Sequence, residues 1–466
     1  MPVIPEGIAY AYTHETTQAT TGYFSCQPPA SLTLPQALAR LEATPFDDFL
    51  RQHCLRQLSR RSPEEIKNLA DELYDRETDS FRRMGLAGLL LECSLLVPEL
   101  AHCCDGFPED ALQRLTLSSS LIYLRAASRK DFGLMQAWSA HFADNIARHH
   151  MLPHWEELEL ELPYSEEELE VCREGLRARA GMLEREHARM QAEDLPRLER
   201  RPAQETYEQA VNALLENDVL AGQEMRHQAS LSPIALLRSW KVDLAVDCGR
   251  MRHSLRGEAT AYGRGLSLAA ARASYAMEIV ERASSYVSVA RTGEHTFEVT
   301  NRRRPMPLVH ASCAKLRSQG KGFLPLSSLP LETPFEDYVP LYWLEARNPE
   351  GKTVLVPAQA VFLFCNLDEQ SLFLAGGSTG LASGNTEAEA RLAALTEIVE
   401  RDAEATTPFS REGCFVLKSR DERLQALLDD YAARGIQIQF QDITTELGVP
   451  VYRCFVMSRR GEVAQA

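Results

Sequence analysis

The sequence has 466 residues, of which 44% are hydrophobic, and its 66 acidic and 50 basic side chains give a net charge of −16. This is the composition of an ordinary globular chain with room for two or three domains, and its acidic balance argues against a nucleic-acid partner, because phosphate backbones need a clustered basic surface. A nucleotide is not excluded, since magnesium can offset phosphate charge against acidic side chains.

The first half of the chain has the pattern of helices. Residues 1 to about 30 are polar and show no clear period, whereas the apolar spacing over residues 32–216 is helical almost throughout. Ser62 and Glu65 have the spacing of a capping box and predict a helix start. The other predicted helices begin near Pro35 or cover roughly residues 80–96, 109–128, 132–148, 165–193 and 204–216. We therefore expect residues 1–225 to form an all-α helical domain.

Strand patterns appear only in the second half. The predicted strands cover roughly residues 241–246, 341–346, 352–356, 436–442 and 449–457, with a helix at 422–433. The basic stretch 294–321 has no period and is typical of a solvated loop, with phosphate contact as the less favoured alternative. Strands mixed with helices predict an α/β domain over residues 226–466, so the expected class of the whole chain is α+β.

The second half also contains one loop–helix motif twice. Residues 263–282, GRGLSLAAARASYAMEIVER, align with a later stretch after a shift of 119 positions, which places Gly265 on Gly384 and Ser267 on Thr386. The five residues EIVER at 278–282 recur without a mismatch at 397–401. An identity of this length inside a matched helix start indicates two repeats. We expect these repeats at about residues 226–345 and 346–466.

Each copy carries two glutamates three residues apart. Side chains at this spacing are neighbours on a helix, with Cβ atoms about 5–6 Å apart. If the two helices meet, four or five carboxylates converge, and they need cations, protonation or inward-pointing arginines. Hard oxygen ligands favour magnesium, and the glycine-rich loops before the helices could bind phosphate at backbone N–H groups. The alternative is a solvated helix face with local Glu–Arg ion pairs.

The paired motifs GRGLSLAAARASYAMEIVER and ASGNTEAEARLAALTEIVERDA resemble the YcaO family of ATP-dependent enzymes that activate peptide-backbone amides. The similarity covers about residues 226–466. It implies that glutamates hold Mg²⁺ beside ATP and that a phosphoryl group passes to the amide oxygen. A cysteine, serine or external sulfur nucleophile then adds, which gives azolines, thioamides or related products. The implied partners are a peptide or protein substrate and an accessory protein for sulfur delivery or recognition.

The resemblance also assigns residues by matching positions. The implied magnesium ligands are Glu278, Glu281, Glu389, Glu397 and Glu400. The implied nucleotide contacts are Arg226, Ser232, Arg264, Arg282, Ser383, Asn385 and Arg401. Arg264 stands where the family often has lysine, which keeps the positive charge. A third acidic helix of the family has no counterpart before Ala466, so the domain is expected to be C-terminally incomplete. The alternative function is therefore a non-catalytic helical adaptor with a degenerate YcaO half.

Other candidate sites are disfavoured. The histidines at 141–154 have no cysteine at ligand spacing, which argues against zinc. Residues 376–380 match G-x-S-x-G, but the next helix begins too late and no histidine follows His310. Eleven cysteines without C-x-x-C, no secretory signal and no apolar run of about 20 residues predict a cytoplasmic protein without a membrane partner. A homodimer is left open.

Overall fold

The structure is a computed structural model that describes residues 7–15, 23–193, 199–228, 230–300, 304–333, 335–348, 350–373, 376–457 and 463–465. The chain packs as two units, and each is described by itself. The first unit contains Met1–Arg129 and Arg201–Asn385, and the second contains Lys130–Arg200 and Thr386–Ala466. Across the described ranges, no helix combines the length and the apolar character needed to cross a membrane.

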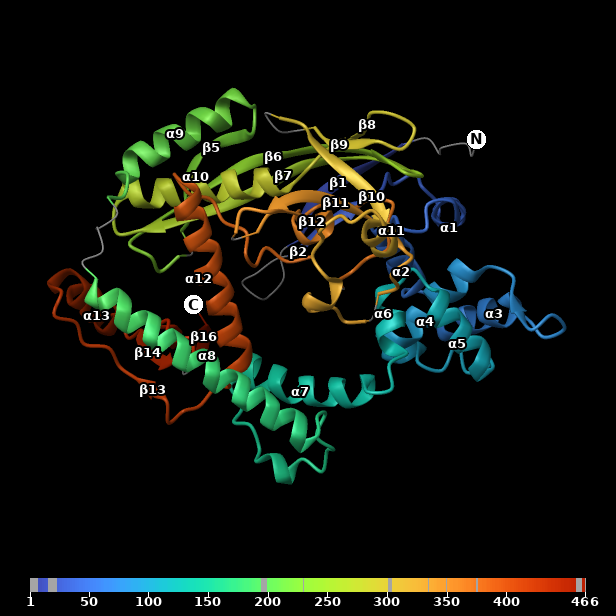
Figure 1. The fold of residues 1–466 in the computed structure, drawn as a ribbon, viewed down its shortest axis with the longest axis horizontal. Helices are drawn as coiled ribbons and strands as arrows, with labels where there is room; N and C mark the ends of the chain where they lie inside the picture. Colours follow the sequence, from blue (N-terminus) through green and yellow to red (C-terminus); the bar gives the residue numbers. More distant parts are fainter. Residues whose placement is uncertain are drawn as a thin grey trace. The chain divides into compact units, whose positions relative to one another are not determined.

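A ten-stranded mixed sheet forms the centre of the first unit (Figure 1). Its order is β12-β11-β10-β9-β8-β6-β7-β1-β2, and β5 pairs with β6. The strands are β1 (Ile8–Glu15), β2 (Tyr23–Gln27), β5 (Leu220–Arg226), β6 (Ile234–Cys248), β7 (Met251–Gly265), β8 (Val289–Arg291), β9 (Phe297–Val299), β10 (Met306–Ser312), β11 (Pro340–Arg347) and β12 (Thr353–Pro357). Helix α10 (Leu268–Ser285) packs against β6 and β7, and α9 (Ala203–Glu216) packs against α10. Helices together with a mixed sheet confirm the predicted α+β class.

Strands β1 and β2 lie in the region that the sequence pattern predicts as all-α. Ile8, Tyr10 and Tyr12 are buried while Ala9 and Ala11 are exposed, the alternation of a strand with one buried face. Strand β1 pairs in parallel with the distant β7, a long-range contact that a local helical period does not reveal. Residues 1–225 are therefore mainly helical rather than all-α.

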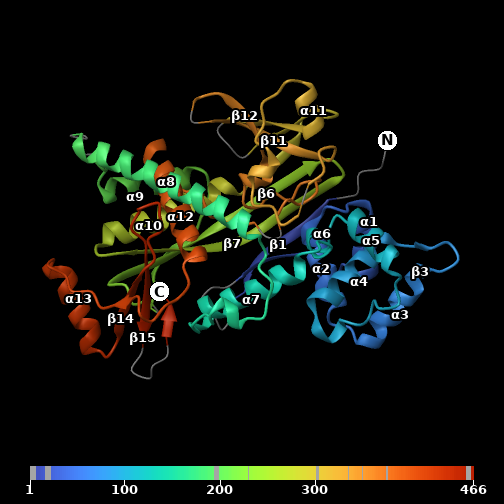
Figure 2. The same ribbon diagram turned by 60° about the horizontal axis from the view of Figure 1, so that its bottom comes forward.

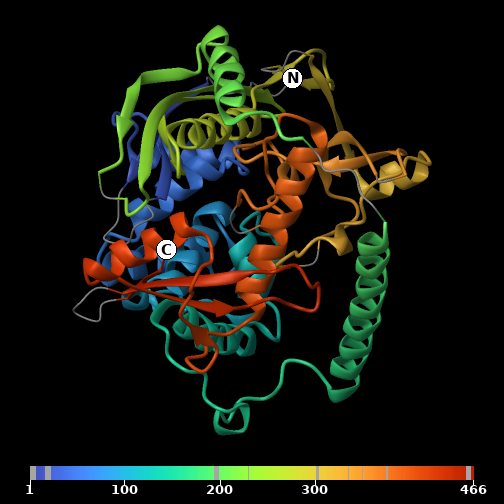
Figure 3. The same ribbon diagram turned by 90° about the vertical axis from the view of Figure 1, so that its left-hand side faces the viewer.

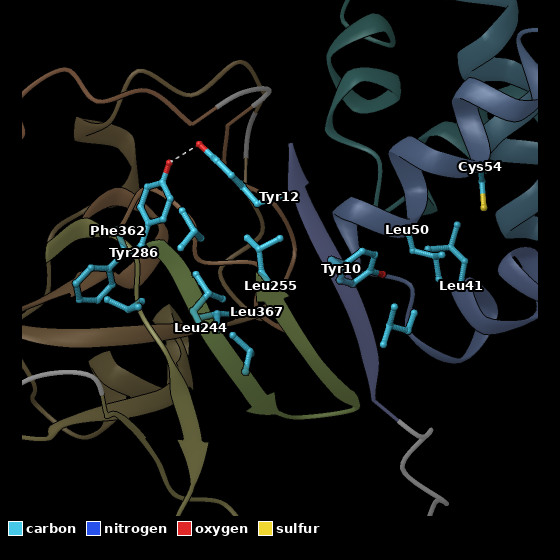
Figure 4. Close-up of a cluster of buried hydrophobic side chains, with 14 of the residues drawn as sticks. Tyr10, Tyr12, Leu41, Leu50, Cys54, Leu244, Leu255, Tyr286, Phe362 and Leu367 are labelled. Atoms are coloured by element: carbon cyan, nitrogen blue, oxygen red, sulfur yellow. Dashed lines mark hydrogen bonds between the residues drawn. The ribbon is translucent and has the colours of Figure 1, made fainter. Parts of the chain in front are cut away.

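Two tyrosines join β1 to the rest of the first unit. The hydroxyl of Tyr10 donates a hydrogen bond to Asp47 (2.8 Å), the residue that caps the following helix α2. The hydroxyl groups of Tyr12 and Tyr286 lie 3.0 Å apart, with Phe362 nearby (Figure 4). Burial is the main cause that raises the pKa of both Tyr12 and Tyr286, so these hydroxyls stay protonated and available for hydrogen bonding.

The other described helices of the first unit are α4, five helices that contact it, and α11, which contacts β10. They are α1 (Leu34–Ala43), α2 (Asp48–Leu58), α3 (Pro63–Leu73), α4 (Met84–Leu96), α5 (Glu109–Ser118), α6 (Ile122–Ala127) and α11 (Cys313–Ser318), with 3₁₀ turns at Pro98–Leu100, Leu326–Ser328 and Ala358–Ala360 and a two-stranded ribbon of β3 (Tyr74–Asp75) and β4 (Ser80–Phe81). The predicted capping box is confirmed, since Ser62 accepts from the Glu65 N–H and Glu65 accepts from the Ser62 N–H. The basic stretch 294–321 is not a loop throughout, because β9, β10 and α11 lie in it.

The second unit combines two segments that are far apart in sequence. Its helices are α7 (Phe132–Arg148), α8 (Glu166–Ala192), α12 (Glu387–Thr406) and α13 (Glu422–Ala433), with a 3₁₀ turn at Trp155–Glu157. A small antiparallel sheet of β13 (Cys414–Phe415), β14 (Gln437–Asp442), β15 (Tyr452–Met457) and β16 (Val463–Gln465) completes it (Figure 2). Strands β14 and β15 run side by side as its longest pair (Figure 3).

Asn145 joins the two segments of the second unit. This buried side chain on α7 accepts from the Phe409 N–H (2.7 Å) and donates to the Phe409 carbonyl (3.2 Å). The ring of His149 lies 5.1 Å from both Phe409 and Phe455. Residues 130–200 therefore pack with the C-terminal segment, so the limits of the units differ from the predicted domain boundary after residue 225. That boundary, and the repeats at 226–345 and 346–466, stay predictions.

Candidate functional site

The two predicted helix starts are confirmed and have the same local geometry. Ser267 caps α10 by accepting from the Ala270 N–H (3.2 Å), and Thr386 caps α12 by accepting from the Glu389 N–H (3.2 Å). The backbone angles φ and ψ are −136° and 158° at Ser267 and −134° and 162° at Thr386. The two motifs therefore share the backbone conformation of the cap residue as well as their sequence.

The glycines before α10 permit close packing rather than forming an open loop. Gly263 and Gly265 end strand β7, and Gly265 pairs with Ile234 of β6. A Cβ atom at Gly263 would lie 2.0 Å from the Ala271 carbonyl oxygen and 2.7 Å from the Tyr275 nitrogen. A side chain at this position would therefore push the helix off the strand. The sequence predicts a phosphate-binding loop at Gly263 and Gly265, but these glycines lie in a strand that packs closely against α10.

Two carboxylates and two guanidinium groups gather on α10 and the end of β7. The side chains of Glu278 and Glu281 are 40% and 19% exposed, and Arg282 lies 3.8 Å from Glu278 and 3.6 Å from Glu281. Partial burial raises the pKa of the Glu278 carboxyl group, and the nearby charges of Arg282 and Arg264 oppose that rise. Four of the predicted site residues thus share one electrostatic environment.

The segment before α12 touches the same part of α10. The Ser383 hydroxyl donates a hydrogen bond to the Met277 carbonyl (2.7 Å), one residue before Glu278. Asn385 accepts a long hydrogen bond from Arg201 (3.4 Å). Ser383 therefore lies beside the acidic part of α10, and its nucleotide contact stays a prediction.

Arg226 and Ser232 lie at the turn between β5 and β6. Register places Arg226 opposite Leu236, and Leu236 lies opposite Gly263, so one strand separates Arg226 from the contact of β7 with α10. The Ser232 hydroxyl donates to the Ile234 carbonyl (3.2 Å), which uses its donor within the turn. Their predicted nucleotide contacts stay predictions.

Helix α12 repeats the ion pairs of α10. The guanidinium of Arg401 lies 2.7 Å from Glu400, 3.9 Å from Glu397 and 3.4 Å from Glu404. Glu397 and Glu400 are 28% and 57% exposed, and Glu389 is partly buried in the first turn. The local Glu–Arg pairs considered as an alternative are therefore present in both copies.

The apolar side chains on α12 are largely exposed. Leu392, Leu395 and Ile398 are 51%, 61% and 46% exposed. The buried contacts of the helix come instead from Ala403, with Val399 packed against Ile443 and Val451. The C-terminal turns of α12 thus pack against residues next to the ends of β14 and β15.

The described residues contain no group of three or more histidine, cysteine, aspartate or glutamate side chains placed to hold a metal ion. Each helix nevertheless offers two neighbouring carboxylates. Magnesium in phosphate sites is held by one or two carboxylates together with the phosphates and water. The donor set on each helix therefore fits magnesium in the company of a nucleotide.

Sequence reasoning missed a polar cluster that joins β5 to α10. Glu224 on β5 accepts hydrogen bonds from the Arg272 guanidinium (3.0 and 2.9 Å) and from the Tyr275 hydroxyl (2.8 Å). Burial works to raise the pKa of Glu224, but these hydrogen bonds outweigh it and the pKa is lowered. The sequence feature that could have indicated this cluster is Arg272, which matches Arg391 in the duplicated motif. Its partner Glu224 on β5 has no local sequence signal.

Arg272→Met is expected to destabilise the first unit by about 1–2 kcal/mol, because Glu224 would stay partly buried without its bidentate partner. Urea unfolding followed by circular dichroism measures the effect. Arg391→Met is the matched control: Arg391 pairs with exposed Glu387 in the same helix, so its loss should change stability by less than about 0.5 kcal/mol. Equal effects of the two substitutions would contradict a structural role for the cluster.

Comparison with known proteins adds a family and several relatives. Residues 262–466 match the family model described as YcaO cyclodehydratase, ATP- and Mg²⁺-binding. The chain is 28% identical over 204 residues to an uncharacterized protein in the tfuA 3′ region of Rhizobium leguminosarum bv. trifolii, covering 42% of this chain and 44% of that protein. It is 30% identical over 197 residues to an uncharacterized protein of Methanothermobacter thermautotrophicus, covering 40% and 45%. The chain thus spans less than half the length of the curated relatives it matches.

Two solved structures are also similar. One is a heterocyclase in complex with substrate and cofactor, at 18% identity and a TM-score of 0.38, covering 59% of this chain and 39% of that chain. The other is the YcaO protein of Methanopyrus kandleri bound with AMPPCP and Mg²⁺, at 19% identity and a TM-score of 0.34, covering 55% and 57%.

Proposed function

Because residues 262–466 belong to the YcaO family, we propose that this protein uses ATP and Mg²⁺ to activate a backbone amide of a peptide or protein. The observation that carries the proposal is the gathering of Glu278, Glu281, Arg282, Arg264 and Ser383 at one part of α10. Carboxylates that bind a hard cation and guanidinium groups that bind phosphate are the two donor types that a magnesium–nucleotide site needs.

In the proposed reaction the amide oxygen attacks the γ-phosphorus of ATP, and the bond from that phosphorus to the ADP oxygen breaks. A cysteine, serine or external sulfur nucleophile then adds to the amide carbon. Phosphate leaves with the former amide oxygen, and for an azoline the nucleophile and the amide nitrogen each lose a proton. Which of the azoline, thioamide or related products forms depends on the nucleophile.

In this scheme the residues of the chain bind Mg²⁺ and orient the nucleotide. Mg²⁺ would supply positive charge against the phosphates, and Glu278 and Glu281 would hold it. Arg264 and Arg282 would orient the carboxylates or the phosphates. The same proposal assigns Glu389, Glu397 and Glu400 to Mg²⁺, and Arg226, Ser232, Ser383, Asn385 and Arg401 to the nucleotide.

Calorimetry of ATP binding with and without Mg²⁺ tests the proposal on the full gene product. We expect magnesium-dependent binding that falls at least about tenfold in the double variant E278Q/E281Q, and likewise in E397Q/E400Q, because each removes two hard anionic ligands. Glu387→Gln is the control, since this first-turn glutamate of α12 is 77% exposed and pairs with Arg391. Unchanged binding in both double variants would show that the assignment is wrong.

Failure of the wild-type protein to bind ATP would favour the alternative, a non-catalytic helical adaptor. The local pairing of both E-x-x-E motifs with their own arginines is the observation consistent with it. The cytoplasmic location, a homodimer, an accessory protein and the missing third acidic helix stay predictions of the sequence.

A further inference from the structure

Helix α8 of the second unit is long, yet none of its 27 residues is buried (Figure 1). It makes no extensive contact with another described helix or strand of its unit. Isolated helices are marginally stable in water, and most helices of folded proteins gain their stability by packing an apolar face. Helix α8 therefore lacks a packing partner within the described part of its unit.

One side of α8 is apolar along the length of the helix. At about 100° per residue, six small or apolar residues fall within an arc of about 80°, and we call them the α8 stripe. They are Leu169, Cys172, Leu176, Ala180, Leu183 and Met190. No aspartate, glutamate, lysine or arginine of α8 falls within this arc. Two side chains of the stripe, Leu176 and Met190, are 41% and 50% exposed, so α8 presents an apolar face that is open to a partner.

The charges of α8 are distributed unevenly along the helix. Residues 166–174 contain five glutamates and one arginine, a net charge of −4, whereas residues 175–192 contain four arginines and two glutamates, a net charge of +2. A second α8 in parallel orientation would place like charges beside each other and repel the first. A second α8 in antiparallel orientation would place the acidic part of each helix beside the basic part of the other. Helix α8 is therefore complementary in charge to an antiparallel copy of itself.

The α8 stripe also selects a register for the antiparallel arrangement. Placing Leu169 of one copy level with Met190 of the other also places Leu176 level with Leu183, so large apolar side chains meet across the contact. Charged residues then lie level with opposite charges at three positions along the helix: Glu170 with Arg189, Arg173 with Glu186 and Glu174 with Arg185. The same register therefore satisfies the apolar residues and the charges.

We infer that α8 binds α8 of a second copy of this chain as an antiparallel pair of helices, with the α8 stripe as the shared apolar seam. The contact is isologous, because both copies use the same surface and a two-fold axis relates them. None of the residues assigned above to ATP or Mg²⁺ lies on α8, so the inference does not rest on the proposed function.

Sedimentation equilibrium of the full-length protein between about 1 and 100 µM tests the inference. We expect a reversible dimer whose dissociation constant rises at least about tenfold in Leu176→Glu, because a charge then lies in the apolar seam. Met190→Glu, near the other end of the stripe, should weaken the dimer in the same direction. Val171→Glu is the matched control: Val171 is 65% exposed and lies about 160° around the helix from Leu169, so the dissociation constant should change by less than about threefold.

Chemical cross-linking determines the direction of the two helices. Among the cysteines of the chain, all of which the structure describes, Cys172 alone is exposed. In the antiparallel register Cys172 lies level with His187 of the second copy, whereas the two Cys172 side chains are separated by about 22 Å along the helix axis. A short bifunctional maleimide should therefore link two copies of His187→Cys and should not link two copies of the wild type. Adding Cys172→Ser to His187→Cys should abolish the link.

Three outcomes would overturn the inference. The first is a protein that stays monomeric over the whole concentration range. The second is a dimer that neither Leu176→Glu nor Met190→Glu weakens, because its interface would then lie on another surface. The third is a wild-type protein that cross-links through Cys172, because the two helices would then run in parallel. Circular dichroism of each variant verifies that α8 remains helical, so that a weakened dimer reports the contact and not unfolding.

Discussion

Replacing Gly263 with alanine is expected to destabilise the first unit by more than about 3 kcal/mol, since the new methyl group would overlap helix backbone that cannot move locally. Its Cβ would meet the carbonyl oxygen of Ala271 at 2.0 Å and the nitrogen of Tyr275 at 2.7 Å. Relief requires α10 to shift away from β7, which would also displace Glu278 and Glu281. Urea unfolding, monitored by circular dichroism, measures the loss.

Gly377→Ala is the matched control for Gly263→Ala. A Cβ atom at Gly377 has no neighbouring atom within 4 Å, and the residue has no left-handed φ angle. We expect this variant to unfold within about 0.5 kcal/mol of the wild type. If Gly263→Ala were equally stable, α10 would not lie against β7 as closely as the structure has it.

Glu369→Gln is expected to remove a large pH dependence of stability. Burial raises the pKa of Glu369 from 4.5 to about 8 in the folded state. The folded protein therefore holds a proton that the unfolded chain releases between these two values, so the wild type loses stability as the pH rises from about 4.5 to about 8. The loss is about 1.4 kcal/mol per pH unit, or about 4 kcal/mol between pH 5 and pH 8.

The glutamine side chain does not titrate, so the free energy of unfolding of Glu369→Gln should depend less on pH by about 4 kcal/mol between pH 5 and pH 8. Relative to the wild type, the variant should therefore be more stable at pH 8 than at pH 5. Urea unfolding at each pH unit from 5 to 8 gives both curves. Glu387→Gln serves as the control for removing a glutamate that is 77% exposed. Parallel curves for wild type and Glu369→Gln would mean that this carboxyl group is hydrated and ionised in the folded protein.

Features that depend on neighbours in sequence could be predicted, and those that depend on distant partners could not. The caps at Ser62, Ser267 and Thr386 follow from short-range spacing, and the structure confirms all three. The alternating residues of β1 become a strand only through pairing with β7, more than 230 positions away as at Tyr10 and Leu255. The stretch 294–321 likewise gains its strands from antiparallel pairing with neighbours in the sheet.

The candidate site likewise contains residues that the sequence reveals and residues that it does not. The glutamates and arginines of the duplicated motif are visible because the motif occurs twice, whereas Glu224 and Glu369 carry no local signal. Glu224 matters through Arg272 on another element, and Glu369 through the enclosure around it. Burial of a single carboxyl group is set by tertiary packing, which one sequence does not display.

The interleaving of the two units has a consequence for synthesis on the ribosome. The buried amide of Asn145 on α7 can form its hydrogen bonds with the Phe409 backbone only after Phe409, 264 residues later, has been synthesised. At about 5–20 residues per second, that interval is about 13–50 s. Helices α7 and α8 emerge long before the strands that complete their unit, while the other unit is still interrupted by them. Throughout this delay the nascent chain carries Asn145 without the backbone groups that satisfy its amide in the folded unit.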